Sequence, residues 1–452
     1  MEETIAAIAT PLGVGSLCVV RISGKIALKV ADAVFHGRRG KPSEYATQTL
    51  HYGVVHDGEQ ALDEVLLAVL RAPHSYTTED VVEISCHGGM FTGKRILDLV
   101  IKKGARLAHP GEFTRRAFLN GRIDLTQAEA VLDIVSAQTE GAHTAAVAQL
   151  EGHLYHRLQK LYDHLSNTLA HMEAQIDFPE EGITPETRET LVEHIRDAMS
   201  FQRELLRTAR DGRILREGIR TIIVGKPNVG KSSLLNALLG QDRAIVSATP
   251  GTTRDFIEEL VSIEGLPLRM MDTAGIRDSK EEVEQAGIAR ARRHLDAAEL
   301  VLLVLDSSKK LEKIDRELIA ACKEKPMIVA LNKIDLGQVV DGNYLRDLPT
   351  CSMSLKTGDG LDSLRKRITT HLWQGKTRES FREIFINARH QEALNRSHTA
   401  LKKTAEALKE KRSFEYVAAD LREALEALGE VTGRTVTKDL LDRIFSQFCI
   451  GK

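Results

Sequence analysis

Long apolar runs and paired cysteines are both missing from this sequence of 452 residues. No stretch approaches the roughly 18–20 apolar residues that a membrane-spanning helix needs. Acidic Glu2 and Glu3 stand where a secretory signal would carry basic residues, so we expect no signal peptide. The five cysteines are scattered without a CxxC pair, which argues against a zinc site and favours a reducing cytoplasm.

An excess of charge of one sign is also lacking. The formal net charge is −2, with 42% hydrophobic and 28% charged residues, which is typical of an ordinary soluble protein. Nucleic-acid binding would therefore need a local basic patch. Two groups of basic residues are candidates for contact with tRNA or a partner protein: Arg213, Arg216 and Arg220, and Lys402, Lys403, Lys409, Lys411 and Arg412. The length predicts two or three domains.

The first 118 residues predict a compact α+β module. Short apolar runs predict strands at 5–11, 17–22, 65–70 and 81–85, and helical patterns cover 26–34 and 93–103. Arg21 and Glu83 each interrupt an apolar strand. From the pattern alone, an edge-strand charge or a salt bridge is the favoured interpretation of both residues.

Long helices are predicted on both sides of the middle of the chain. An apolar stripe with steps of three and four runs from Leu150 to Ile176 and predicts one continuous helix. Further helical patterns cover 185–209, 387–410, 414–428 and 437–448. The segment after residue 375 is too short for a good domain of its own. We therefore expect one helical domain into which the central domain is inserted.

Residues 225–232 read GKPNVGKS and lie between an apolar run and a helical pattern. This strand–loop–helix context is the one that a phosphate-binding loop requires. Gly225 and Gly230 allow the backbone N–H groups to wrap around a phosphate. Lys231 can reach the β- and γ-phosphates, and the Ser232 hydroxyl can bind Mg²⁺. The alternative is a glycine-rich turn that matches by chance, which the flanking strand and helix make improbable.

Four further stretches follow in the order of a guanine-nucleotide switch. TPGTTRD at 249–255 offers a threonine to Mg²⁺, and DTAG at 272–275 supplies an aspartate near the metal and a glycine for the γ-phosphate. NKID at 332–335 places Asp335 where it can accept from N1–H and the 2-amino group of guanine, donors that adenine lacks. SLK at 354–356 completes the base pocket. Together these stretches predict a GTPase.

The glutamine that orients the attacking water in Ras-type enzymes is absent, because Ile276 follows Gly275. Another group must orient that water, and spacing alone does not choose among four nearby acids, Asp278, Glu281, Glu282 and Glu284. No intrinsic arginine finger can be assigned. A cation is therefore a candidate for neutralising the charge that develops between the β- and γ-phosphates.

Over its whole length the sequence resembles the tRNA-modifying GTPase family MnmE, also called TrmE. The resemblance is carried by IATP at 8–11, VVRISG at 19–24, APHSYT at 72–77, VEISCHGG at 82–89, PGEFTRRAFLNGRIDL at 110–125 and the terminal FCIGK at 448–452. It implies an N-terminal α+β dimerisation domain similar to tetrahydrofolate-binding modules (1–118), a helical domain (119–215 and 376–452) and an inserted P-loop, Ras-like G domain (216–375).

The resemblance implies a potassium-stimulated GTPase that couples hydrolysis to carboxymethylaminomethyl or aminomethyl modification at carbon 5 of the tRNA wobble uridine. The implied partners are tRNA, a second copy of the chain and the protein MnmG (GidA), which carries FAD. The implied cofactors are Mg²⁺, K⁺ and a one-carbon tetrahydrofolate, in the 5-formyl or methylene form. The alternative is a ribosome-assembly switch similar to Era and EngA, which share TPGTTRD and NVGKS. The N-terminal pattern and the CIGK ending favour tRNA modification.

The resemblance also assigns roles to residues of the G domain. Glu284 matches the catalytic glutamate that orients water. Ser232 and Thr253 would hold Mg²⁺. Potassium would be held by Asn228, Thr252 and the carbonyl groups of Ser247 and Thr249. The residues expected around GTP are Asn228, Val229, Gly230, Lys231, Ser232, Ser233, Ser247, Ala248, Thr249, Pro250, Gly251, Thr252, Thr253, Asp272, Thr273, Ala274, Gly275, Asn332, Lys333, Asp335, Ser354 and Lys356.

The implied folate contacts are Arg21, Glu83, Arg122 and Lys452. For Arg21 and Glu83 this assignment replaces the purely structural interpretation, because a cation suits the glutamyl tail and an acid suits the pterin ring. Cys449 lies beside Lys452 in the sequence. We interpret it as a packing thiol rather than a nucleophile, because no histidine base lies near it in the sequence.

Overall fold

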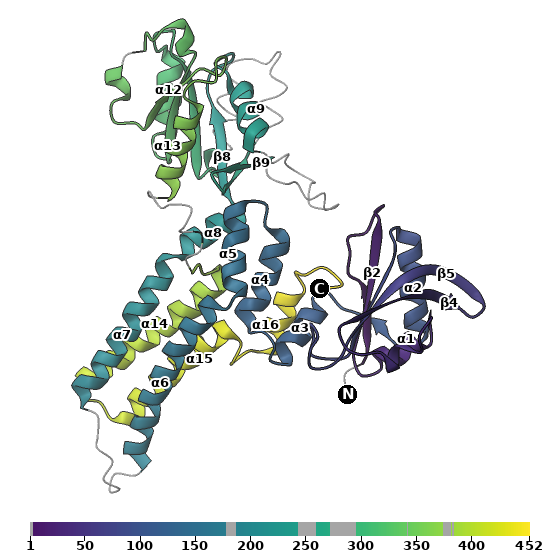
Figure 1. Ribbon diagram of the computed structural model, residues 1–452. Helices are drawn as coiled ribbons and strands as arrows, with labels where there is room; N and C mark the ends of the chain where they lie inside the picture. The colour runs from purple at the N-terminus through teal and green to yellow at the C-terminus, as the bar shows by residue number, and fades with distance from the viewer. Residues whose placement is uncertain are drawn as a thin grey trace. The chain divides into compact units, whose positions relative to one another are not determined.

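The structure is a computed structural model that describes residues 3–177, 187–242, 259–271, 295–340, 342–373, 381 and 384–452. The chain divides into two compact units, which are described separately. Unit 1 combines Met1–Leu132, Tyr155–Glu186 and Glu410–Lys452, and unit 2 combines Asp133–Leu154 and Thr187–Lys409. Each unit therefore draws on segments that are far apart in the sequence (Figure 1).

A seven-stranded sheet in the order β3-β4-β5-β6-β2-β1-β7 forms the N-terminal part of unit 1. Neighbouring strands are antiparallel, except that β1 and β7 are parallel. The predicted strands are confirmed, whereas β3, β4 and β7 were not predicted. The strands are Ile5–Ile8 (β1), Leu17–Ser23 (β2), Phe35–Gly37 (β3), Thr49–Asp57 (β4), Gln60–Leu70 (β5), Val81–His87 (β6) and Arg106–Leu107 (β7).

The two faces of this sheet have different chemistry because side chains alternate along a strand. Helices α1 (Ala27–Asp32) and α2 (Met90–Lys102) pack on one face, where residues such as Val20 and Ile84 form the core. On the opposite face Arg21 lies directly across from Glu83 in the register of β2 and β6. Two charged side chains on one face thus meet without entering the core.

The remaining helices of unit 1 include one that begins later than predicted. The stripe from Leu150 was expected to lie on one helix, but Leu150 ends α5 (Glu140–Leu150) and α6 starts at His153. The cause is Gly152, whose φ of +85° is left-handed and stops the preceding helix. The other helices are α3 (Glu112–Leu119), α4 (Leu125–Ser136), α15 (Phe414–Thr432) and α16 (Lys438–Phe445), and a 3₁₀ turn spans Pro42–Glu44.

Unit 2 contains a six-stranded sheet in the order β13-β12-β11-β8-β10-β9, which is parallel except for the β9–β10 hairpin. Its strands are Ile219–Val224 (β8), Glu259–Ile263 (β9), Leu266–Met270 (β10), Leu300–Asp306 (β11), Met327–Asn332 (β12) and Thr350–Ser352 (β13). Its helices are α5, Arg188–Arg207 (α7), Ala209–Glu217 (α8), Lys231–Asp242 (α9), Lys313–Cys322 (α12), Leu361–Trp373 (α13) and Ala388–Lys409 (α14), with 3₁₀ turns at Ile334–Leu336 and Gly342–Leu345.

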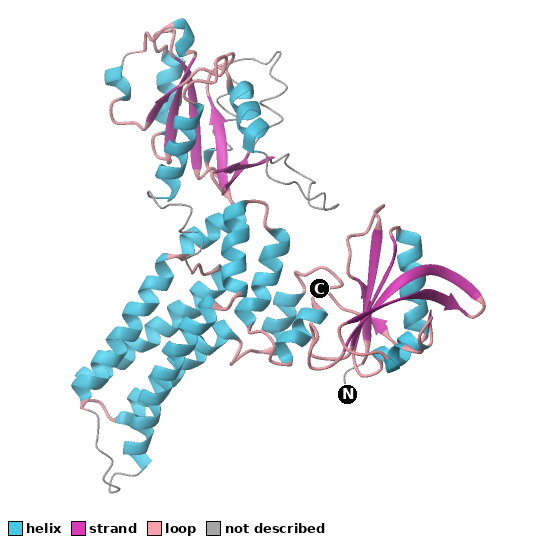
Figure 2. Cartoon of the chain, viewed as in Figure 1, coloured by secondary structure: helices cyan, strands magenta, loops and turns pink. Residues whose placement is uncertain are grey.

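Helices cover both faces of this second sheet, as Figure 2 shows. Apolar residues of α9 and α13 pack on one face, and residues of α12 pack on the other. The central strands β8, β11 and β12 are almost entirely buried, as expected for parallel strands with helices on both sides. Among the described residues, no helix is both long and apolar enough to cross a bilayer.

A buried ionic cluster joins α3 to the segment before β1 and to the loop before β6. The Arg116 guanidinium forms an ion pair with Glu79 at 3.0 Å and another with Glu112 at 2.9 Å, and it donates to the carbonyl group of Glu3. Arg106 donates to both carboxylate oxygens of Glu112. Burial opposes the charge of Glu112, but these donors and the backbone N–H of His109 lower its pKa to about 2.

We predict that Glu112 stabilises unit 1 at neutral pH through its charge. A carboxyl group whose pKa is lowered on folding contributes stability above its unfolded pKa, and that contribution is lost as the pH falls from about 4.5 towards about 2. Glu112→Gln should therefore lower the opening free energy of α3 amides by about 3 kcal/mol at pH 7, and by less than half as much at pH 3. Native-state hydrogen exchange measures both values.

Glu59→Gln is the matched control, because Glu59 is exposed in the turn between β4 and β5. It should leave the exchange of α3 amides unchanged at both pH values. An equal loss at pH 7 and pH 3 in Glu112→Gln would show that the charge of Glu112 is not the source of the stability.

Candidate functional site

Three of the predicted nucleotide-binding stretches meet at one edge of the six-stranded sheet. The phosphate loop follows β8, Asn332 ends β12, and Ser354 lies just beyond β13. Strands β8, β11, β12 and β13 are parallel, so their carboxyl ends lie at the same edge. In an open parallel sheet this edge is where ligands bind.

The phosphate loop requires glycine at two positions because other groups approach its backbone closely. A Cβ atom on Gly225 would collide with the carbonyl oxygen of Val304, and one on Gly230 would collide with the side chain of Asn332. Between them, Asn228 has a left-handed φ of +63°, which asparagine tolerates better than most residues. The backbone of the loop therefore depends on glycine at both positions.

Asn332 joins the phosphate loop to the loop that follows β13. Its side chain is 3% exposed. Its Nδ2 donates to the carbonyl oxygen of Val229 at 2.7 Å, and its Oδ1 accepts from the backbone N–H of Leu355 at 3.1 Å. This asparagine was predicted as a base-pocket residue, and the structure shows that it also connects the phosphate-binding and base-binding sides of the site.

The predicted phosphate ligands lie at the start of α9. The Nζ of Lys231 donates to the carbonyl oxygen of Lys226 at 2.8 Å, and burial lowers the pKa of Lys231. Ser232 and Ser233 follow in the first turn of the helix, and the N-terminal end of a helix favours an anion. These residues can hold a phosphate with a bound divalent cation.

The predicted base-binding residues are held by a second set of contacts. Asp335 Oδ1 accepts from the Ser354 hydroxyl at 2.7 Å, and Lys333 Nζ lies 2.7 Å from Asp306 Oδ2. Burial raises the pKa of Asp306, but the bonds from Lys333 and Ser308 outweigh burial and hold it below its ordinary value. Lys356 follows on the same loop as Ser354. An Asp335 side chain oriented in this way is the acceptor that guanine recognition needs.

The rest of the predicted GTP site lies outside the described residues. This applies to the switch stretch and its cation ligands, to the DTAG stretch and to the catalytic glutamate: Ser247, Ala248, Thr249, Pro250, Gly251, Thr252, Thr253, Asp272, Thr273, Ala274, Gly275 and Glu284. Those assignments therefore stay predictions.

A second site lies in unit 1, where the structure brings together the four predicted folate contacts. Arg21 Nε forms an ion pair with Glu83 Oε1 at 2.7 Å, and Arg21 Nη1 donates to the carbonyl oxygen of Gly451 at 3.3 Å. The salt bridge weighed from the strand pattern is thus present. Lys452 is held nearby, because its carbonyl oxygen accepts from the N–H of Phe113 at 3.1 Å.

Tyr76 lies between the two predicted folate arginines, and sequence reasoning did not single it out. The Arg122 guanidinium is 4.9 Å from the centre of the Tyr76 ring, and that of Arg21 is 5.8 Å from it. The Tyr76 hydroxyl lies 2.9 Å from Thr114 Oγ1. The only signal in the sequence was its place in the APHSYT motif, because both arginines come from distant segments.

Cys449 is exposed, so its interpretation as a packing thiol is wrong. The contact at this position comes from the backbone: the N–H of Gly111 donates to the Cys449 carbonyl oxygen. A Cβ atom on Gly451 would collide with the carbonyl oxygen of Ile8, which shows how closely the terminal segment lies against β1.

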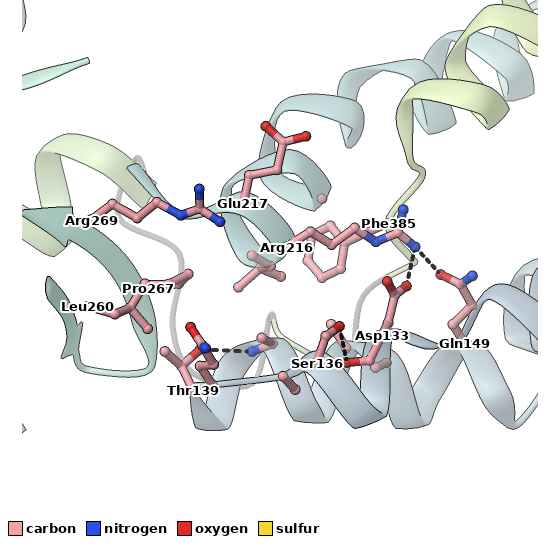
Figure 3. A pocket seen from close by; sticks show the side chains of 17 residues that line it. Asp133, Ser136, Thr139, Gln149, Arg216, Glu217, Leu260, Pro267, Arg269 and Phe385 are labelled. Atoms are coloured by element: carbon pink, nitrogen blue, oxygen red, sulfur yellow. Dashed lines mark hydrogen bonds and ion pairs between the residues drawn. The ribbon is translucent and has the colours of Figure 1, made fainter. Parts of the chain in front are cut away.

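A small cavity of about 60 Å³ lies within unit 2 between the α4–α5 turn, α8 and the β9–β10 hairpin (Figure 3). At one end Arg216 contacts Asp133 and Gln149, and Arg269 extends into the cavity from β10. Arg213 and Arg220 both form ion pairs with Glu299. Each arginine of the first candidate basic cluster therefore has an acidic partner within unit 2, although Arg213 and Arg220 share the single carboxylate of Glu299.

Comparison with known proteins places the chain in one family. Family models described as "MnmE helical domain" and "GTP-binding protein TrmE N-terminus" match residues 125–449 and 4–122. The tRNA modification GTPase MnmE of Clostridioides difficile is 46% identical over all of both chains, and that of Geobacter sulfurreducens is also 46% identical over all of both. The solved G domain of the T. maritima FeoB iron transporter is 29% identical to this chain. The match covers 34% of this chain and 98% of the FeoB chain, with a TM-score of 0.26.

The two family models together span nearly the whole sequence, and the relatives match from end to end. The resemblance inferred from the motifs is confirmed, and the chain belongs to the MnmE family of tRNA modification GTPases.

Proposed function

We propose that this protein hydrolyses GTP and couples the hydrolysis to modification at carbon 5 of the wobble uridine in tRNA. The observation that carries the proposal is the Asn332 contact with Val229 and Leu355, which joins a phosphate loop to a guanine-type base pocket in a chain of this family. The curated relatives are named tRNA modification GTPases, and they match the chain over its full length.

In this proposal the described residues bind and orient the nucleotide. Lys231 leaves the Lys226 carbonyl group and turns to the β- and γ-phosphates when GTP enters. The Asp335 carboxylate, oriented by Ser354, accepts the two donors of guanine. Mg²⁺, held by Ser232 and Thr253, would neutralise phosphate charge. Glu284, which matches the catalytic glutamate of the family, would orient the attacking water in place of the glutamine that is absent at Ile276.

Potassium is the proposed cation between the β- and γ-phosphates. Asn228 supports this assignment, because it carries an amide oxygen and lies in the phosphate loop between Gly225 and Gly230. Thr252 and the carbonyl groups of Ser247 and Thr249 would supply the other ligands. A fixed positive charge at this position stabilises the negative charge that develops during transfer.

We therefore predict that GTP hydrolysis depends on the alkali cation. The turnover number in potassium should exceed that in sodium by at least about tenfold, a small part of what a well-placed charge contributes in other active sites. Steady-state rates at equal ionic strength provide the measurement. Asn228→Ala should lose most of the difference between the two salts. Equal rates of the unaltered protein in sodium and potassium would contradict the potassium assignment.

The second site is proposed to bind a one-carbon tetrahydrofolate. A carboxylate such as Glu83 suits the paired N–H donors of a pterin ring. The cationic Arg21, Arg122 and Lys452 suit the carboxylates of a glutamyl tail. Arg21 and Arg122 share the ring of Tyr76, so the two guanidinium groups are held in a fixed relation before any ligand arrives.

We predict that Arg122→Ala weakens binding of 5-formyltetrahydrofolate by about tenfold, because one charge-assisted contact is lost. Isothermal titration calorimetry gives the dissociation constant. Arg38→Ala is the control: Arg38 follows edge strand β3, which β4, β5 and β6 separate from β2, so its loss should leave the folate affinity unchanged. Unaltered affinity in Arg122→Ala would remove this residue from the site, and no binding by the parent protein would contradict the folate proposal.

The remaining elements of the proposal concern assembly. The sheet face that carries Arg21 also exposes Leu50, Tyr52 and Leu66, which suits contact with a second copy of the chain. Sedimentation analysis distinguishes a dimer from a monomer. MnmG with its FAD and tRNA are the proposed partners. The G domain, residues 216–375, is proposed as an insertion in a helical domain formed by 119–215 and 376–452, with residues 1–118 as the folate-binding and dimerisation domain.

A further inference from the structure

Lys226 is the second residue of the phosphate loop, and its side chain contacts another helix rather than the nucleotide-binding edge. Its Nζ lies 2.9 Å from Glu312 Oε2 and 2.8 Å from Asp315 Oδ2. The Lys226 side chain is 16% exposed and that of Asp315 is 5% exposed, so the pair is largely shielded from water. The GxxxxGKS pattern leaves this position open, and neither the family resemblance nor the motif gave Lys226 a role.

The two carboxylates belong to the start of α12. Glu312 is its N-cap residue and Asp315 is the third residue of the helix, and the backbone N–H of Glu312 donates to Asp315 Oδ2 at 2.9 Å. Asp315 Oδ2 therefore serves the helix cap and Lys226 together. Burial opposes the charge on Lys226, but Asp315 and Glu312 outweigh burial and raise its pKa. The ammonium group also offsets the repulsion between the two carboxylates.

The backbone of Lys226 makes a different contact. Its carbonyl oxygen accepts from Lys231 Nζ at 2.8 Å, so the lysine proposed to bind phosphate rests on this residue. One residue therefore bonds to α12 through its side chain and to Lys231 through its main chain. A displacement of Lys226 changes the position from which the Lys231 amine starts when a nucleotide arrives.

We propose that Lys226 is a positioning residue that fixes the first turn of the phosphate loop to α12. It thereby sets the position of the Lys231 amine in the protein without nucleotide. This inference rests on the proposed GTPase function and deepens it. In this role Lys226 touches no phosphate. A site whose groups are already in place loses less free energy on binding, so the loss of the anchor should weaken nucleotide binding more than it slows hydrolysis.

The test compares Lys226→Met with Lys226→Arg in the full-length protein. Lys226→Met should raise the dissociation constant of fluorescent GDP and the KM for GTP by about tenfold, the effect of losing one charged contact, with kcat changed by less than about threefold. Lys226→Arg should restore both values to within about twofold, because a guanidinium group can bridge two carboxylates. A purely stabilising ion pair would not give this split between KM and kcat.

Lys313→Met is the matched control, because Lys313 belongs to the same helix and its side chain is 93% exposed. It should leave KM and kcat unchanged. In the Glu312→Gln/Asp315→Asn background, the further change Lys226→Met should alter KM by less than about twofold, because the anchor is already lost. If Lys226→Met does not fold, the Glu312→Gln/Asp315→Asn variant alone should show the same rise in KM.

Three results would overturn the inference: an unchanged KM in folded Lys226→Met, a failure of arginine to restore it, or the full effect in the background without the two carboxylates. A parent protein that binds guanine nucleotides but does not hydrolyse GTP would contradict the proposed function instead. The anchor would then still be tested by the affinity for GDP.

Discussion

The amide group of Asn332 is the contact on which the nucleotide site depends. Asn332 is the last residue of β12, one of the buried parallel strands. Its amide group bonds to the phosphate loop on one side and to the loop after β13 on the other. Both partners are backbone groups, so the connection does not depend on the rotamers of other side chains. Because the amide is buried, loss of either bond leaves an unpaired polar group, which is costly. The phosphate-binding and base-binding sides of the site are therefore held at a fixed position relative to each other.

The same site shows how a sheet edge gathers residues that are distant in the sequence. The parallel strands β8, β12 and β13 end together, and each delivers a loop with a different chemical task. Glycines 225 and 230 permit the close approach of these loops, and α9 adds its N-terminus. Lys226 adds a connection on the other side, to α12. The phosphate loop is thus supported by the sheet edge and by a covering helix.

The β9–β10 hairpin gives the nucleotide sheet a second connection within unit 2. A Cβ atom on Gly141 of α5 would collide with the carbonyl oxygen of Gly265, so the hairpin turn and α5 approach each other closely. In the sequence this hairpin lies between the predicted TPGTTRD and DTAG stretches. Arg216, bonded to Asp133 and Gln149, fixes α8 to α4 and α5 beside it. Helical segments that precede and follow the sheet strands in the sequence therefore contribute residues to the core of the sheet.

Local patterns predicted that GKPNVGKS and NKID follow strands, because each motif carries its chemistry within a few residues, and the structure places both motifs at one sheet edge. Several strands, most helices and the Arg21–Glu83 pair were also predictable from alternation and spacing, whereas β3, β4 and β7 were not. Features that depend on distant contacts were not: Tyr76 and its two arginines, the exposure of Cys449, and the bonds from Lys226 to Glu312 and Asp315. The helix break at Gly152 was missed because the leucine spacing continues through it.

The central claim is that guanine-nucleotide binding at this site drives the modification of tRNA. The most direct measurement is nucleoside analysis of wobble uridines from cells that lack this protein, with and without its restored gene. The account predicts that carbon-5 modification disappears, returns with the parent protein and does not return with Asp335→Asn, which loses guanine recognition. Normal modification in cells that lack the protein would contradict the account and favour a role in ribosome assembly.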